Sequence, residues 1–332
     1  MADGGRRFAL IVFAALALAA IVVPLGAYVR LSDAGLGCPD WPGCYGQIGV
    51  PEAAHHIEQA NLAYPERPVE AAKAWKEMIH RYFAGALGLL ILVAAIVAIV
   101  RRRLPDQPVA LPVFLLLLVI FQAALGMWTV TWLLKPAVVT AHLIGGMATL
   151  GLLAWLALRV GRPARLEVSA GTRWLARAAL VVVIAQITLG GWVSTNYAAI
   201  ICDDFPTCQG RWWPPMDFAD AFHIWRGLGI DYEGGVLGND ARVAVQMTHR
   251  IGALVTLLFA GLAAVGALRA RSAAVRGLGV LVGVALGAQI ALGIGNVLLD
   301  LPLSVAVAHN AVAAALLLSL IWLNYVYVRA PE

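Results

Sequence analysis

Eight apolar stretches, each about 20 residues long, constrain the fold of this chain more than any other feature. They lie at about 8–28, 80–100, 111–133, 138–158, 174–194, 246–268, 276–298 and 304–327. A helical stretch of this length crosses a hydrocarbon core of about 30 Å. Only helices and closed barrels satisfy their backbone polar groups in lipid, and the sequence lacks the alternating pattern of a barrel. We therefore predict an all-α integral membrane protein with eight transmembrane helices.

Charged residues are sparse and unevenly distributed. They make up 13% of the 332 residues, compared with about 25% in a soluble protein. The two long loops on one side of the eight spans, about 31–78 and 195–245, each hold seven acidic residues against three basic ones. The other side collects arginines at helix ends: Arg6, Arg7, Arg101, Arg102, Arg103, Arg159, Arg162, Arg165, Arg173, Arg269, Arg271, Arg276 and Arg329.

This distribution predicts the orientation of the chain. The positive-inside rule places the arginine-rich side, and with it both termini, in the cytoplasm. The net charge of +5 then follows from membrane topology and does not indicate nucleic-acid binding. The first apolar stretch is longer than the core of a usual signal peptide and has no clear cleavage site, so we interpret it as the first helix. The composition favours a multi-pass protein of the bacterial cytoplasmic membrane.

The chain contains an internal repeat. The segment from Val29 to Gly46 matches the segment from Val193 to Gly210, and both place two cysteines at the same spacing. The segment from Glu77 to Arg81 matches the segment from Gln246 to Arg250. Chance agreement at so many fixed offsets is unlikely.

A third pair of matching segments runs from Gln122 to Gly126 and from Gln289 to Gly293. Each half therefore has four helices, and an even number makes the halves run in the same direction, about an axis along the membrane normal. We predict two pseudo-symmetric four-helix bundles, an N-terminal half at 1–165 and a C-terminal half at 166–332.

Four histidines occupy matching places in the two halves. His80 and His249 lie at the expected starts of the second and sixth helices. His142 and His309 lie one turn into the fourth and eighth, 20 residues after a matching glutamine. The second and fourth helices of an up-and-down bundle face each other across its centre, where bundles bind cofactors. Ionisable groups inside membranes usually mark function. Each pair is thus predicted to bind one haem iron from both axial sides.

Other interpretations of these residues are weaker. A lone histidine near a helix end is usually interfacial, but two repeated pairs at similar depth are not lone residues. Zinc prefers three or four close ligands, and no third helix supplies one. Arg81 and Arg250 follow two of the histidines, and their guanidinium groups suit a haem propionate as well as an interfacial position.

The four cysteines form two pairs with the same spacing, both in the outer loops. Because that side is oxidising, we expect two disulfides, Cys38–Cys44 and Cys202–Cys208. Each would close a small ring and shape the loop above a haem pocket. Redox activity of the first pair, and a zinc site that uses all four cysteines, are alternatives.

The two halves differ at a few matching positions. Glu77 in the first half corresponds to Gln246 in the second, and Arg30 corresponds to Ser194. Glu77 shares one helix face with His80, so an acid lies beside a haem-binding position and can transfer a proton. The first half is therefore predicted to hold the reacting molecule. The second half is predicted to hold a permanent, electron-carrying haem.

These motifs in combination resemble the haem A synthase family. The resemblance rests on the run from Gly26 to Pro42, on Glu77-x-x-His80-Arg81, on Gln122-x-x-Leu-Gly126 with His142, and on the second-half copies, and it covers about 8–327. It implies an oxidoreductase that converts the C8 methyl group of haem O to the formyl group of haem A by two successive hydroxylations and loss of water.

The resemblance also implies roles for the histidine pairs. His249 and His309 would bind a haem b cofactor, with Arg81 and Arg250 as further binding residues. His80 and His142 would receive the substrate haem O, and Glu77 would be the catalytic acid. The implied partners are the lipid bilayer, a membrane electron donor and the haem O synthase that supplies the substrate, and a homo-oligomer is compatible with the sequence.

Two alternatives belong to other functional classes. A di-haem b-type electron-transfer protein explains four histidines equally well, but it gives no reason for Glu77 and Arg30 to break the repeat. A haem transporter would favour broken helices in matching places, and the sequence shows none. The second outer loop, about 195–245, is long, and we interpret it either as a partner surface or as a lid over the second haem.

Overall fold

The computed structural model describes residues 3–329 and contains the eight predicted long helices. All eight are long and apolar enough to cross a membrane. They are α1 (Asp3–Leu31), α3 (Ala71–Val100), α4 (Ala110–Thr131), α5 (Pro136–Gly161), α6 (Ala170–Thr195), α8 (Asn239–Leu268), α9 (Ala273–Leu298) and α10 (Leu303–Val326). The prediction of an all-α membrane protein with eight transmembrane helices is confirmed.

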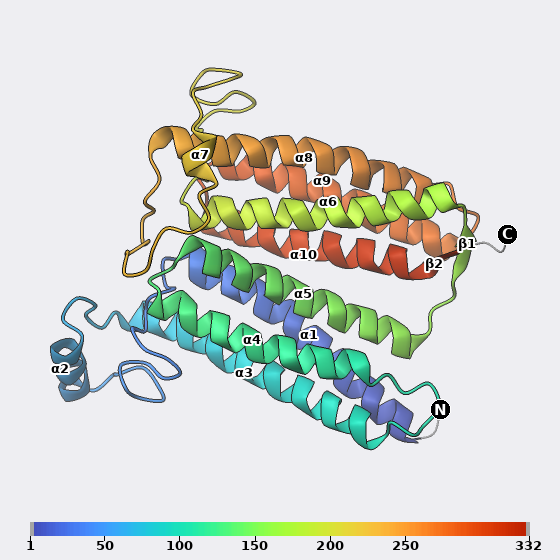
Figure 1. The fold of residues 1–332 in the computed structure, drawn as a ribbon, viewed down its shortest axis with the longest axis horizontal. Helices are drawn as coiled ribbons and strands as arrows, with labels where there is room; N and C mark the ends of the chain where they lie inside the picture. The colour runs from blue at the N-terminus through green and yellow to red at the C-terminus, as the bar shows by residue number, and fades with distance from the viewer. Residues whose placement is uncertain (1–2, 330–332) are drawn as a thin grey trace.

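The long helices pack as two rings of four. In the first ring, α3 and α5 each pack against both α1 and α4, so α3 and α5 lie diagonally across the ring. In the second, α8 and α10 each pack against both α6 and α9 and are likewise diagonal. The rings meet where α1 and α5 contact α10 and where α5 contacts α6. Figure 1 shows the axes of the long helices roughly parallel to one another, with successive helices antiparallel.

The two ends of the helix assembly are unlike. The short helices α2 (Ala54–Ala63) and α7 (Phe218–Ala221) lie with the long loops at one end, which we call the outer end. At the opposite end, β1 (Leu166–Val168) pairs in parallel with β2 (Tyr327–Arg329), with Leu166 opposite Tyr327. The start of α1 and the end of α10 also lie at this end (Figure 1). The terminal residues 1–2 and 330–332 are outside the described part of the chain, and the predicted cytoplasmic location of the termini stays a prediction.

Two helices begin earlier than the hydropathy of the sequence predicts. The expected starts at 80 and 246 are wrong, because α3 begins at Ala71 and α8 begins at Asn239. The added turns are polar on one face and packed on the other. In α3, Ala74 and Met78 are buried in a cluster with Cys38 and Cys44 of the first outer loop. His80 is therefore well inside its helix rather than at the first turn.

Polar contacts between the halves explain one break in the repeat. The Arg30 Nη2 atom donates a hydrogen bond of 2.7 Å to the carbonyl oxygen of Ser194, the residue at the matching position of the second half. The Arg30 guanidinium also lies over the Tyr197 ring, 4.4 Å from its centroid. Nearby, the hydroxyls of Thr140 and Thr195 are 3.2 Å apart across the same boundary. Arg30 thus joins the halves at their outer ends.

Candidate functional site

The four histidines lie on the two diagonal helix pairs. His80 is on α3 and His142 is on α5, and the two imidazoles are close enough to interact electrostatically. His249 on α8 and His309 on α10 form the same kind of pair in the second ring. All four side chains are partly buried. The structure thus brings together the residues that the sequence predicted as two pairs.

Each imidazole lies against a glycine of a neighbouring helix. A Cβ atom at Gly26 of α1 would be 3.0 Å from Cε1 of His80, and a Cβ atom at Gly126 of α4 would be 3.4 Å from Cε1 of His142. In the second half, a Cβ atom at Gly190 of α6 would be 3.2 Å from Cε1 of His249. A Cβ atom at Gly293 of α9 would be 3.1 Å from Cε1 of His309. The glycines leave room for four rings directed into the bundle centres.

Glu77 is the buried acid of this region. Its side chain is 5% exposed, and its Oε2 atom accepts a hydrogen bond of 2.9 Å from the backbone N–H of Cys38. Its Oε1 atom accepts a hydrogen bond of 2.5 Å from Nη2 of Arg81. The acid therefore lies three residues before His80, between the first disulfide loop and an arginine. Gln246, its counterpart, donates only to the carbonyl oxygen of Ala199, at 3.3 Å.

Arg81 and Arg250 bind the backbone of the disulfide loops. The Nη1 atom of Arg81 donates to the carbonyl oxygens of Asp40, at 3.0 Å, and of Gly43. The Nη1 atom of Arg250 donates to the carbonyl oxygen of Thr207 at 2.7 Å, and Nη2 to that of Asp204 at 3.0 Å. Sequence reasoning missed this role, because backbone acceptors leave no residue signature. A contact of either arginine with a haem propionate remains a prediction.

The two disulfide loops have the same local structure. Cys38 is bonded to Cys44, and Cys202 is bonded to Cys208. In the first loop the Asp40 carboxylate accepts hydrogen bonds of 2.7 Å from the backbone N–H groups of Tyr45 and Gly46.

The matching carboxylate of the second loop, Asp204, also accepts hydrogen bonds from two backbone N–H groups. Asp204 accepts from the N–H groups of Gln209, at 2.7 Å, and Gly210, at 3.0 Å. Gly46 and Gly210 have φ values of +74° and +71°, where a side chain would be strained. The aspartate and glycine positions of the repeat are explained by these turns.

The second outer loop crosses onto the first half. Tyr232 is 1% exposed, packs with Leu36, Val130 and Leu134, and donates its backbone N–H to the carbonyl oxygen of Leu133 at 3.1 Å. In Figure 1 the golden segment after α7 reaches towards the outer ends of α4 and α5. The sequence left open whether this loop covers the second haem or binds a partner, and both stay predictions. The structure adds that its glycine-rich part packs against the outer end of the first half.

Two charged side chains of the first half, Arg67 and Lys135, bind the segment of the second outer loop that lies on the first half. Arg67 of the first loop pairs with Asp231 at 2.7 Å and with Glu233 at 2.8 Å. Lys135 is 1% exposed. Its Nζ atom donates to the carbonyl oxygen of Gly227 at 2.6 Å and lies 3.3 Å from the centroid of the Trp225 ring. The glycine-rich segment is therefore held to the first half on both sides.

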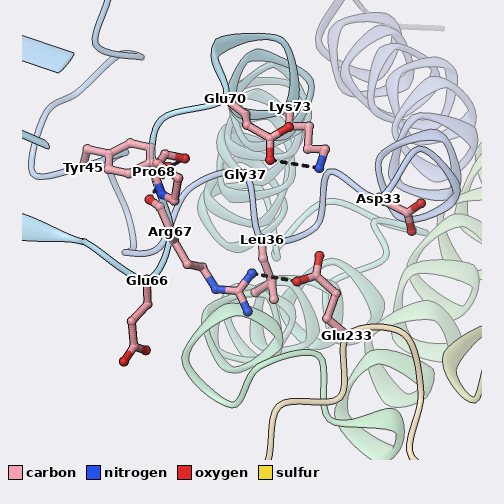
Figure 2. A pocket seen from close by; sticks show the side chains of 10 residues that line it. All are labelled: Asp33, Leu36, Gly37, Tyr45, Glu66, Arg67, Pro68, Glu70, Lys73 and Glu233. Carbon is pink, nitrogen blue, oxygen red and sulfur yellow. Dashed lines mark hydrogen bonds and ion pairs between the residues drawn. The ribbon is translucent and has the colours of Figure 1, made fainter. Parts of the chain in front are cut away.

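A polar cleft of about 220 Å³ opens beside this crossing. Figure 2 shows Arg67 reaching across it to Glu233, so that both outer loops form its walls. Gly37, in the wall, lies directly on α3, since a Cβ atom there would be 2.7 Å from the backbone carbon of Lys73. The next residue, Cys38, donates to Glu77. The cleft is lined by Asp33, Leu36, Gly37, Tyr45, Glu66, Arg67, Pro68, Glu70, Lys73 and Glu233.

The donor set fits an iron porphyrin better than a bare metal ion. Within residues 3–329, no group of three or more His, Cys, Asp or Glu side chains is arranged to hold a metal ion. Two imidazoles per bundle would suit the iron of a haem, whose porphyrin ring would supply the remaining ligands. The Nδ1 atoms of His80, His142 and His309 are buried without a hydrogen-bond partner, so these rings keep polar atoms for a ligand or its surroundings.

Comparison with known proteins agrees with these features. The sequence profile of the COX15-CtaA family, described as cytochrome oxidase assembly proteins, matches residues 9–321. A protein of Shewanella oneidensis named heme A synthase is 48% identical over 92% of both chains. The chain belongs to the haem A synthase family. A heme A synthase of Caulobacter vibrioides is 31% identical over 95% of this chain and 94% of its own, and one of Paracoccus denitrificans is 29% identical over 95% and 86%.

The structure reveals one further residue beside the histidines that the sequence analysis missed. Gln186 of α6 contacts His249, and its spacing to Gly190 equals the spacing of Gln122 to Gly126 and of Gln289 to Gly293. The repeated glutamine and glycine would have revealed it. It was overlooked because its counterpart in the first half is not a glutamine but Val22.

Proposed function

We propose that this chain is a haem A synthase that oxidises the C8 methyl group of haem O to a formyl group. The observation that carries the proposal is the unequal pair of sites. Two bundles present the same two histidines, but only the first has a buried carboxylate, Glu77, three residues before one of them. A protein that only carried electrons through two haems would not need this acid.

The second half holds the resident cofactor in this proposal. His249 and His309 would hold haem b, which would supply electron transfer to or from the reacting half when bound. The contacts of these two imidazoles with Gln186 and Gln289 support a site built for a ligand that stays. Arg250 holds the second disulfide loop beside it.

The first half receives the substrate. His80 and His142 orient haem O, and Glu77 takes or gives a proton beside the methyl group. The acid is suited to this work because burial removes competing water, while Arg81 and the N–H of Cys38 fix both carboxylate oxygens. The second outer loop and the first disulfide loop together cover this end and limit the access of water.

The proposal includes a membrane orientation and partners. The outer end, with both disulfides, faces the oxidising side of a bacterial cytoplasmic membrane, and the arginine-rich end faces the cytoplasm. Haem O reaches the first half from the haem O synthase that makes it. A membrane electron donor exchanges electrons through the second half.

The test is the haem content of the full-length protein. We would purify it in detergent from cells that make haem O, extract its haems, separate them by chromatography and record a reduced-minus-oxidised spectrum. We expect haem b together with haem O, its hydroxylated form or haem A. Haem b alone, at two per chain, would overturn the proposal and favour the di-haem electron carrier.

A further inference from the structure

Three of the four histidines have a glutamine beside them, on the helix that also supplies the facing glycine. The glutamine precedes that glycine by four residues, which is about one helical turn. The pairs are Gln122 with Gly126, Gln186 with Gly190, and Gln289 with Gly293. On α1 the same position, four residues before Gly26, is Val22.

The contact is closest in the second half. The Nε2 atom of Gln186 is 3.1 Å from Nδ1 of His249 and 2.9 Å from its carbonyl oxygen. The Nε2 atom of Gln289 is 3.2 Å from Nε2 of His309. Both histidines of this pair therefore touch an amide that can fix the plane of the ring.

A second glycine makes room for the glutamine. A Cβ atom at Gly252, three residues after His249, would be 2.1 Å from Oε1 of Gln186. A Cβ atom at Gly145, three residues after His142, would be 1.5 Å from Nε2 of Gln122. The position three residues after His80 is Phe83. His80 thus lacks both the glutamine and the glycine that accommodates it.

We propose that Gln186 and Gln289 are positioning residues that hold the imidazoles of His249 and His309, and that His80, which has Val22 in place of such a residue, is the releasable ligand of the first half. This inference rests on the proposed function and deepens it by naming the one of the four histidines that dissociates from the haem iron. His142 stays held, with the Gln122 amide packed against its helix at Gly145.

The physical reason lies in the orientation of the ring. A group that hydrogen-bonds a metal-binding imidazole fixes the plane of its ring, and loss of that group weakens binding. The Gln186 amide bridges Nδ1 of His249 and the carbonyl oxygen of the same residue, so it fixes the ring relative to its own backbone. Val22 offers no polar atom, so His80 receives no such contact from this position.

The experiment measures how fast the full-length protein loses haem b to excess apomyoglobin. Gln186→Leu is expected to release haem b about tenfold to 100-fold faster, as for other partners of metal-bound histidines, and to raise its reduction potential. Gly252→Ala removes no polar group but displaces Gln186, so it should have the same effects. Gly266→Ala is the matched control on the same helix, because a Cβ atom there meets nothing within 4 Å.

Two further variants separate positioning from simple packing. Gln186→Glu keeps a polar group of nearly the same size and can accept a proton from Nδ1 of His249, so it should hold haem b and lower its reduction potential below that of the wild type. The double variant Val22→Gln with Phe83→Gly gives His80 the missing pair of residues. It should release haem O more slowly from the first half, while its unchanged haem b content shows that it folds.

The outcomes distinguish this inference from the proposed function. If Gln186→Leu and Gly252→Ala release haem b as slowly as Gly266→Ala, and without a change in potential, positioning by glutamine is wrong while haem binding stands. Unaltered release of haem O from the double variant would overturn the assignment of His80. If the wild type holds no haem b, or holds it equally after His249→Ala, the proposed function fails and this inference fails with it.

Discussion

In the second half, Gln186 contacts His249 and Gln289 contacts His309. The residue three positions before His249 is the neutral Gln246. In the first half, His80 has no such contact, and Glu77 replaces the amide. The backbone frame is shared, including helix order, disulfide loops and facing glycines. The difference teaches how, in our proposal, a few side chains convert similar helix rings into one site that retains its ligand and one that exchanges it.

The outer ends differ as well. The second loop extends over the first half, where Arg67, Lys135 and Leu133 bind it. The first loop, by contrast, stays with its own half, where Cys38 and Cys44 pack with Ala74 and Met78 of α3. The first half is thus contacted at its outer end by a segment that belongs to the second half.

The largest expected effect comes from removing one histidine in each half. His249→Ala should abolish retention of haem b during purification, because a haem with one axial ligand and an altered pocket is bound far more weakly. His80→Ala should keep haem b and lose haem A formation. Haem extraction after detergent purification measures both. Equal loss of haem b in the two variants would show that the halves are not specialised.

The next largest effect should follow Glu77→Gln, which gives the first half the side chain of the second. We expect the rate of haem A formation to fall about 100-fold to 10,000-fold, the usual contribution of a general acid or base. The hydrogen bond from Cys38 can still be accepted by the amide, and haem b content should not change. Gln246→Glu is the matched change, and its rate should remain near that of the wild type. Equal falls in both would contradict a special role of Glu77.

A smaller effect is expected from Arg67→Ala, which removes both ion pairs to the second loop. Each partly exposed pair contributes about 0.2–1 kcal/mol, so the segment should open severalfold more often. Cleavage by trypsin after Arg226 in the folded protein measures this opening. Lys73→Ala is the control, because Lys73 pairs with Glu70 of its own loop. No change in cleavage would mean that Tyr232 and Lys135 alone hold the crossing.

The smallest effect concerns acid and the second disulfide loop. Burial alone would raise the pKa of Asp204, but hydrogen bonds from Thr207, Gly210 and Gln209 outweigh it and hold that pKa below its ordinary value. The carboxylate therefore stabilises the loop at neutral pH, and this contribution is lost as the pH falls through the lowered pKa.

Reduction of Cys202–Cys208 by a phosphine should accelerate modestly below about pH 4, the ordinary range of an aspartate. Asp204→Asn should be reduced faster than the wild type at neutral pH and should lack this acceleration. A wild-type reduction rate that is the same at pH 3 and pH 7 would contradict the stabilising role of the carboxylate.

Much of this architecture could be predicted from hydropathy and the repeat. The eight spans and the diagonal histidine pairs follow from apolar length and from even helix number. The starts of α3 and α8 could not be predicted, because their outer turns are held by packing on loops and not by lipid. The arginine contacts were also hidden, since carbonyl oxygens belong to every residue. The pseudo-symmetry of the halves and the division at residue 165 remain predictions.

The crossing of the second loop has a consequence for how such proteins diversify. A gene duplication produces two interchangeable halves only while the loops of each half make their contacts within that half. Here a foreign C-terminal half joined to residues 1–165 would leave Lys135 as a buried cation without the Gly227 carbonyl, and Leu133 without Tyr232. Substitutions in the contacting segments of the two halves must therefore be compatible with each other. Chimaeras should function only when the segment from Trp225 to Glu233 is transplanted with the half that it covers.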